Sequence, residues 1–263
     1  MTQRIVTGVI GAAVFLGILF LGGLYFEIGV AALAVIAIYE LFMMKGLKIF
    51  SLEGILASFA CLSLVLPVAS WFNMSSDASF VFFGLFLFLM LIGMVFLNGK
   101  YSLEDIGFPF LAAFYVGFGF QNLVLAREKG VILVLLAVFI VWSTDMGAYF
   151  VGRSFGRHKL APTISPNKTI EGSIGGILAA VVISVIMIVA FKNQLPAIGL
   201  VKMIVFAVIF SIVSQLGDLV ESSIKRQYGV KDSGKILPGH GGILDRFDSL
   251  IFVFPIMHLL GLF

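Results

Sequence analysis

The stretch from Phe80 to Leu97, FVFFGLFLFLMLIGMVFL, contains no charged side chain. The hydrocarbon layer of a bilayer is about 30 Å thick, and a helix needs about 20 mostly apolar residues to cross it. The whole chain of 263 residues shares this character, because 60% of it is hydrophobic, 12% is charged and its mean hydropathy is +1.14. Soluble domains carry about 25% charged residues. The composition therefore excludes an ordinary soluble fold and predicts a protein that crosses a membrane several times.

Further stretches of the chain have the same length and apolar character. A helix is the expected form of each, because lipid offers no hydrogen-bond partner to an unpaired backbone group. We therefore predict an all-α, polytopic bundle of about nine transmembrane helices. In chain order the stretches are Ile5–Leu24, Phe26–Met44, Leu52–Trp71, Ser79–Leu97, Ile106–Ala126, Val131–Phe150, Ser173–Phe191, Leu200–Val220 and Phe247–Leu262.

The basic residues predict the orientation of this bundle. Most links between the stretches are short, and only two are long, residues 151–172 and 221–246. The amino terminus and every second link, including both long ones, carry 13 of the 17 Lys and Arg residues, against 4 on the other side with Lys202 included. Cytoplasmic loops carry such an excess. We therefore expect a multi-pass protein of a bacterial-type inner membrane, with its amino terminus and both long links in the cytoplasm. The net charge of +3 then reflects topology and predicts no nucleic-acid partner.

Carboxylates near the ends of three stretches need a reason to be there, because an ionisable group in lipid is costly unless it is paired or hydrated. Asp145 lies near the end of the sixth stretch, Asp218 lies near the end of the eighth, and Asp245 with Asp248 opens the ninth. A lone Asp at a helix carboxyl terminus opposes the helix dipole, whereas an Asp that holds a divalent cation does not. Carboxylates that converge at one level of the membrane predict a site for a hard cation such as Mg²⁺.

Other features receive an ordinary structural interpretation. Glu27 and Glu40 are interpreted as hydrated or snorkelling charges near span ends. The single cysteine, Cys61, excludes an intramolecular disulfide and a thiolate cluster, so zinc is not expected. The small residues between Gly172 and Gly176 predict a close approach of another helix.

The second long link ends in PGHGGILDRFD, residues 238–248, which mixes glycines with both kinds of charge. Gly239, Gly241 and Gly242 stand before a helix start, where the backbone can bend around an anion and offer its N–H groups to it. His240, beside the acidic residues, is a candidate for chemistry. The basic residues of the segment are Lys225, Arg226, Lys231, Lys235 and Arg246.

The first long link carries a similar set of polar residues. Ser165, Lys168 and Thr169 could each contact phosphate oxygens. A Ser-Pro turn followed by a capped helix would explain several of them without any ligand.

At this point the sequence resembles a known family. The run SIKRQYGVKDSGKILPGHGGILDRFD, residues 223–248, is similar to the signature of the phosphatidate cytidylyltransferases, also called CDP-diacylglycerol synthases. The likeness covers the carboxyl-terminal half in detail and the amino-terminal half only as apolar spans. Upstream it includes Asp145, Ala148–Tyr149, Gly152–Arg153, Ser165–Pro166, Lys168–Thr169, Glu171–Gly172, Gln215 and Gly217–Asp218.

The resemblance implies a reaction in which CTP and phosphatidic acid give CDP-diacylglycerol and pyrophosphate, with Mg²⁺ required. It also implies a homodimer in the membrane, with a paired-cation centre at residues that match Asp218 and Asp245, and it allows a second cation such as K⁺. The chain would then divide into spans 1–126, for packing, dimer formation or lipid access, and a catalytic region 127–263 with two cytoplasmic loops.

The residues fit this chemistry independently of the family resemblance. A phosphate monoester has a second pKa of about 6, so phosphatidate needs no strong base, and the task is to neutralise charge around the α-phosphorus of CTP. Asp218 and Asp245 are the expected cation ligands, with Asp248 auxiliary. The other catalytic candidates are Lys225, Arg226 and His240. The candidates for substrate binding are Asp145, Ser165, Lys168, Thr169, Ser222, Ser223, Gly241, Gly242 and Arg246.

Two other functions remain open at this stage. A cytidylyltransferase or CTP-dependent kinase that acts on another lipid would need a similar site. An ion-coupled transporter would also place Asp residues in its spans, but its site is expected near the midplane of the bilayer.

Overall fold

The computed structural model describes residues 2–75, 77–96, 102–196 and 198–263, and helices dominate this part of the chain. The all-α prediction is confirmed, with one short hairpin of strands as the exception. The helices are α1 (Thr2–Leu21), α2 (Gly23–Lys45), α3 (Leu52–Val65), α4 (Val68–Trp71), α5 (Ala78–Phe96), α6 (Leu103–Lys129), α7 (Val131–Phe155), α8 (Ile170–Ala190), α9 (Leu200–Gln227) and α10 (Leu244–Leu259). The strands are β1 (Lys159–Ala161) and β2 (Ser165–Thr169).

Six of the described helices are long and apolar enough to cross a membrane, namely α2, α5, α6, α7, α8 and α9. The number of about nine spans is not confirmed, because the apolar parts of α1 and α3 are shorter and α10 has 16 residues. The third predicted stretch divides at Pro67. This residue has no N–H to donate, and it forces Leu66 into an extended conformation with φ −82° and ψ 138°.

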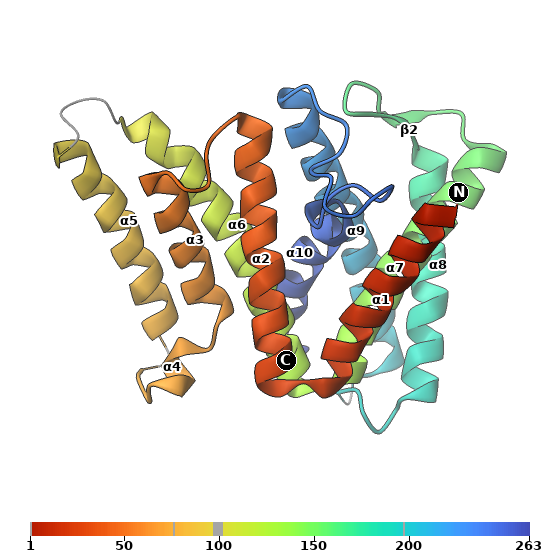
Figure 1. Cartoon of the computed structure of the whole chain (residues 1–263). Helices are drawn as coiled ribbons and strands as arrows, with labels where there is room; N and C mark the ends of the chain where they lie inside the picture. Colours follow the sequence, from red (N-terminus) through yellow and green to blue (C-terminus); the bar gives the residue numbers. More distant parts are fainter. Residues whose placement is uncertain (1, 76, 97–101, 197) are drawn as a thin grey trace. The chain divides into compact units, whose positions relative to one another are not determined.

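The chain forms two compact units, and each is described by itself. The first comprises residues 1–124 and 230–246. Within it α3 packs against α2 and α5, and aromatic rings fill the space between helices, with centroids 5.3 Å apart for Phe83 and Phe110 and 5.8 Å apart for Phe59 and Phe86. The second unit comprises residues 125–229 and 247–263. It contains α7, α8 and α9, which run beside one another in Figure 1.

Glycines allow α7 and α8 to pack closely. A Cβ added at Gly147 of α7 would lie 2.6 Å from the carbonyl oxygen of Gly175, and one at Gly176 of α8 would lie 2.7 Å from the carbonyl oxygen of Thr144. Backbones can approach this closely only where side chains are absent. The close helix approach predicted for residues 172–176 is therefore confirmed.

Helices α7 and α9 extend beyond their apolar stretches into the predicted long links. Helix α9 runs to Gln227 and α7 runs to Phe155, so part of each predicted long link is helical. Asp218 is then more than two turns from the end of α9, and the expectation that it opposes the dipole of a last helical turn is wrong. The links that remain are residues 156–169, which contain the hairpin, and residues 228–243.

The close packing of α7 and α8 yields a prediction. Replacing Gly175 by Leu would force a side chain against Val151 of α7, and overpacking of this kind costs about 1–3 kcal/mol. We expect Gly175→Leu to lower the unfolding temperature of the protein in detergent. Gly84→Leu is the matched control, because a Cβ at Gly84 of α5 meets nothing within 4 Å. Equal effects of the two substitutions would contradict the packing account.

Candidate functional site

Lys168 and Asp218 form an ion pair in the second unit. Lys168 comes from β2 and Asp218 from the second half of α9, before Lys225. Their side chains are 27% and 29% exposed. Ser222, one turn further along α9, donates its hydroxyl to Oδ1 of Asp218 over 3.2 Å. The structure thus brings together residues from both predicted polar segments, and it leaves their charged groups within reach of solvent.

Asp248 joins this pair from α10. The hydroxyl of Ser249 donates to the carbonyl of Ser214 over 3.0 Å, and a Cβ at Gly217 would lie 2.8 Å from the carbonyl oxygen of Asp248, so α9 and α10 are in close contact. Asp248 interacts electrostatically with Asp218, with Asp145 of α7 and with Lys225. Carboxylates from α7 and α9 therefore interact with the one from α10 in the second unit. Asp145 is the exposed one of the three. We call Asp145, Lys168, Asp218 and Asp248 the acidic cluster.

The basic residues of α9 have protein partners as well. Lys225 pairs with Glu221, whose side chain is 0% exposed. Sequence reasoning missed Glu221, although a Glu four residues before a Lys is a recognised helical pair. Arg226 donates from Nε to the carbonyl of Ile164 over 3.3 Å, which ties the end of α9 to the hairpin. Ser223 is exposed on the same helix.

The hairpin gives Thr169 and Ser165 structural roles. Strands β1 and β2 are antiparallel, and Ser165 pairs with Ala161. The expected Ser-Pro turn is therefore wrong, because Ser165 and Pro166 lie in β2. Thr169 caps α8, as expected, since its Oγ1 accepts the N–H of Gly172 over 3.1 Å. Substrate contacts of Ser165 and Thr169 stay predictions.

Asp245 organises the last loop of the first unit, residues 230–243. Its Oδ2 accepts the N–H of Ser233 over 2.8 Å, the hydroxyl of Ser233 over 2.9 Å and the N–H of Gly242 over 2.8 Å. Gly241, with φ +82°, takes the left-handed conformation that brings the loop around this carboxylate. Of the three glycines predicted to offer N–H groups to an anion, Gly242 donates its N–H to the carboxylate of Asp245. Their contact with a substrate anion stays a prediction.

Glu40 of α2 is the main correction to the sequence interpretation. Its side chain is 1% exposed, so it is neither hydrated nor snorkelling. Its Oε1 accepts the N–H of Ile243 and its Oε2 accepts the N–H of Leu244, both over 2.8 Å, and the hydroxyl of Ser233 lies 3.1 Å from Oε2. Glu40 and Ser233 are functional candidates that sequence reasoning missed, because only the fold brings them to this loop.

His240 belongs to this loop, and Arg246 follows it in the first turn of α10. Arg246 donates from a terminal guanidinium nitrogen to the carbonyl of His240 over 2.8 Å. Nδ1 of His240 is buried, without a hydrogen-bond partner among the residues that the structure describes. The chemical roles predicted for His240 and Arg246 stay predictions.

The donor set is suited to Mg²⁺. The described residues contain no group of three His, Cys, Asp or Glu side chains that could hold a metal ion alone. Mg²⁺ commonly takes one or two carboxylates and completes its octahedral shell with water and substrate phosphates. Asp218 in the second unit and Asp245 in the first supply such oxygens. Their joint use as ligands stays a prediction.

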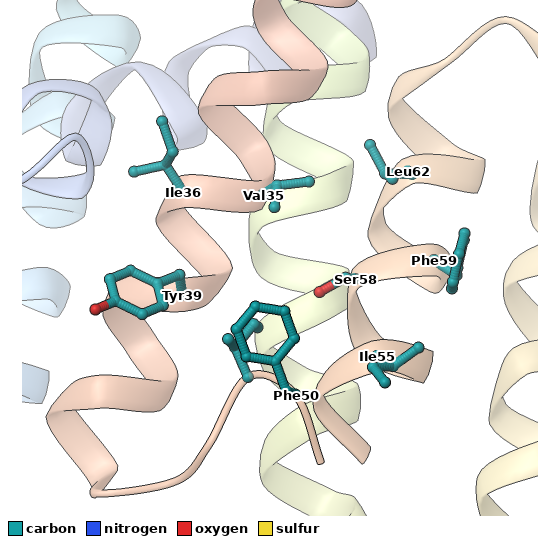
Figure 2. A pocket seen from close by; sticks show the side chains of 9 residues that line it. Val35, Ile36, Tyr39, Phe50, Ile55, Ser58, Phe59 and Leu62 are labelled. Carbon is teal, nitrogen blue, oxygen red and sulfur yellow. The ribbon is translucent and has the colours of Figure 1, made fainter. Parts of the chain in front are cut away.

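A groove in the first unit is apolar and lies between α2, the link that follows it and α3 (Figure 2). Its volume is about 460 Å³. The hydroxyl of Ser58 donates to the carbonyl of Gly54 over 2.8 Å, so this polar group is already satisfied. The groove supplies no charged group for phosphate chemistry. Its lining residues are Val35, Ile36, Tyr39, Ile49, Phe50, Ile55, Ser58, Phe59 and Leu62.

Known proteins resemble this chain over its whole length. A model of the cytidylyltransferase family matches residues 2–263. A phosphatidate cytidylyltransferase of Bacillus subtilis strain 168 is 44% identical over 268 aligned residues, which cover 100% of this chain and 98% of that protein. Phosphatidate cytidylyltransferases of Staphylococcus saprophyticus and Staphylococcus aureus strain COL are 41% and 40% identical over 262 residues, which cover 99% of this chain and 98% of each relative.

The contact between Gly241 and Asp245 can be tested with two glycines. Gly229 and Gly241 both have positive φ, so Ala at either position costs about 1–2 kcal/mol of backbone strain. Only at Gly241 would the added Cβ also meet the carboxylate of Asp245. We expect Gly241→Ala to speed tryptic cleavage at Lys231 and Lys235 several-fold more than Gly229→Ala does. Equal cleavage rates would show that Asp245 does not hold the loop.

Proposed function

Because the chain belongs to the cytidylyltransferase family, we propose that it transfers CMP from CTP to phosphatidic acid and so forms CDP-diacylglycerol and pyrophosphate. The chain is a multi-pass membrane protein, which suits one substrate from water and one from the lipid leaflet. The observation that carries the proposal beyond family membership is the acidic cluster, in which Lys168 of the hairpin meets Asp218 beside Asp248.

The reaction is a displacement at phosphorus. A phosphate oxygen of phosphatidate attacks the α-phosphorus of CTP, a new P–O bond forms, and the bond to the β-phosphate oxygen breaks so that pyrophosphate leaves with the electron pair. Phosphatidate is largely dianionic at neutral pH, so no strong general base is required. The protein must instead hold two anions together and stabilise the charge that gathers on the leaving group.

The basic residues near the acidic cluster would bind the phosphates. Lys168 can exchange the carboxylate of Asp218 for a phosphate oxygen, because both side chains are partly exposed. Lys225 and Arg226 lie further along α9, and Arg246 lies in the first turn of α10. Arg side chains suit phosphate because their planar donors match its oxygens.

Mg²⁺ is the cation that we propose for this site, held by Asp218 and Asp245, where it would neutralise phosphate charge. The hard oxygen donors of both residues support this assignment. A second cation such as K⁺ remains part of the proposal. Replacing K⁺ by Na⁺ in the assay below tests it.

We also propose a cytoplasmic site and a homodimer. The excess of Lys and Arg on one set of links, which includes both long ones, supports the orientation, because cytoplasmic loops carry such an excess. A cytoplasmic site would take CTP from the cytoplasm. The family resemblance supports the dimer.

The enzyme proposal predicts transfer of labelled CMP. Purified protein with α-labelled CTP, phosphatidate and Mg²⁺ should produce labelled lipid and one pyrophosphate for each CMP transferred. Asp218→Asn should lower the rate about 100-fold or more, because it removes a charge that acts at the reacting phosphates. Asp77→Asn, in an exposed link, should leave the rate unchanged.

Three results would contradict the proposal in different ways. Absence of labelled lipid with the unmodified protein would reject the activity. Transfer to another lipid phosphate but not to phosphatidate would reject the substrate. Full activity of Asp218→Asn would reject the site.

The cation proposal predicts that chelation stops the reaction reversibly. EDTA should abolish CMP transfer, and added Mg²⁺ in excess of the chelator should restore it, because the phosphate charge is otherwise not neutralised. Transfer that continues in EDTA would contradict a required divalent cation.

A further inference from the structure

Glu40 is buried in the first unit and has no Lys or Arg partner in the part of the chain that the structure describes. A buried carboxylate without a cation needs hydrogen bonds to remain charged. Glu40 obtains them from Ile243 and Leu244, whose N–H groups each donate over 2.8 Å. These groups open α10, where four N–H groups have no partner within the helix and the helix dipole favours negative charge. Glu40 therefore caps α10 from a different helix.

The loop before α10 leaves room for this carboxylate. A Cβ added at Gly234 or at Gly242 would collide with the side chain of Glu40. Any other residue at either position would push Glu40 away from the start of α10 or move the loop. The glycines of this segment thus fit around Glu40 as well as around Asp245.

Ser233 connects Glu40 to Asp245. Its hydroxyl lies 3.1 Å from Oε2 of Glu40 and 2.9 Å from Oδ2 of Asp245, and the N–H of Asp245 points to the same hydroxyl oxygen over 3.3 Å. A hydroxyl has one proton, so it donates to one of the two carboxylates at a time. A change at Glu40 therefore alters both the helix start that carries Asp245 and the hydrogen bonding of the Asp245 carboxylate.

We propose that Glu40 is a positioning residue, which fixes the first turn of α10 and Ser233 and so holds the carboxylate of Asp245 in the orientation in which it would bind the cation. This inference rests on the proposed function only in assigning Asp245 as a cation ligand. It gives the amino-terminal helix α2 an indirect part in cation binding, because α2 carries Glu40. Groups that orient a metal ligand typically change metal affinity 10–100-fold when they are removed.

The test measures cation affinity in two ways with purified, full-length protein in detergent. Electron paramagnetic resonance of free Mn²⁺ gives its dissociation constant without any turnover. The Mg²⁺ dependence of CMP transfer gives the half-maximal concentration at saturating CTP and phosphatidate. In Glu40→Gln, an amide NH₂ would face the N–H of Ile243 or Leu244, so the start of α10 would lose a hydrogen bond. We expect the Mn²⁺ dissociation constant and the half-maximal Mg²⁺ concentration each to rise at least about 10-fold. The rate at saturating Mg²⁺ should fall less.

Glu27→Gln is the matched control, because Glu27 lies on the same helix and is half-buried. It should leave both values unchanged. Ser233→Ala should raise both, and its effect should not add to that of Glu40→Gln, because the two residues act through one network. Glu40→Asp, which keeps the charge on a shorter side chain, should recover part of the affinity.

The outcomes separate the two claims. Unchanged Mn²⁺ affinity in Glu40→Gln and Ser233→Ala, with a lower unfolding temperature only, would reduce Glu40 to a structural role and overturn the inference. If Glu40→Gln does not fold, Ser233→Ala decides in the same way. Weakened Mn²⁺ binding without CMP transfer by the unmodified protein would support the positioning role and reject the proposed reaction.

Discussion

A charged group in a membrane protein must find its partner within the protein, because the hydrocarbon layer supplies none. This constraint accounts for the partners of two buried carboxylates, because Glu221 pairs with Lys225 and Glu40 accepts the N–H groups at the start of α10. Lys168 and Asp218 pair at a partly exposed position. Leaving one such charge buried and unpaired costs about 3–5 kcal/mol, a large part of the stability of a folded protein. The charges needed for phosphate chemistry are therefore held in place before any substrate arrives.

Much of the helical architecture could be predicted, because apolar stretches of sufficient length have few alternatives in lipid. The ends of the helices could not be read from hydropathy. Helix α9 continues to Gln227 because Glu221 and Lys225 pair along one face, although the sequence there looks like a polar loop. The third stretch divides because Pro67 interrupts backbone hydrogen bonding. The count of spans depends on such local details, whereas the fold class does not.

The candidate site was predictable in composition but not in its internal contacts. The motifs identified Lys168, Asp218 and Asp245, and the structure brings the first two together. The role of Glu40 could not be found in the same way, because 203 residues separate it from Ile243, and only the folded backbone brings them within hydrogen-bond distance. The sequence around an isolated Glu near the end of an apolar stretch is the same whether its side chain snorkels to the interface or caps a distant helix. Thr169 is the opposite case, because its contact is local. It caps α8 through the N–H of Gly172, three residues later, and the sequence alone already predicted a capped helix there.

The central claim is that CTP and its cation bind at Asp218, within the acidic cluster. A structure of the protein with Mg²⁺ and a non-hydrolysable CTP analogue tests this most directly. We predict that Lys168 leaves Asp218 for a phosphate oxygen and that an Asp218 oxygen coordinates the cation nearest the α-phosphate. A triphosphate bound elsewhere, with Lys168 still paired to Asp218, would contradict the account.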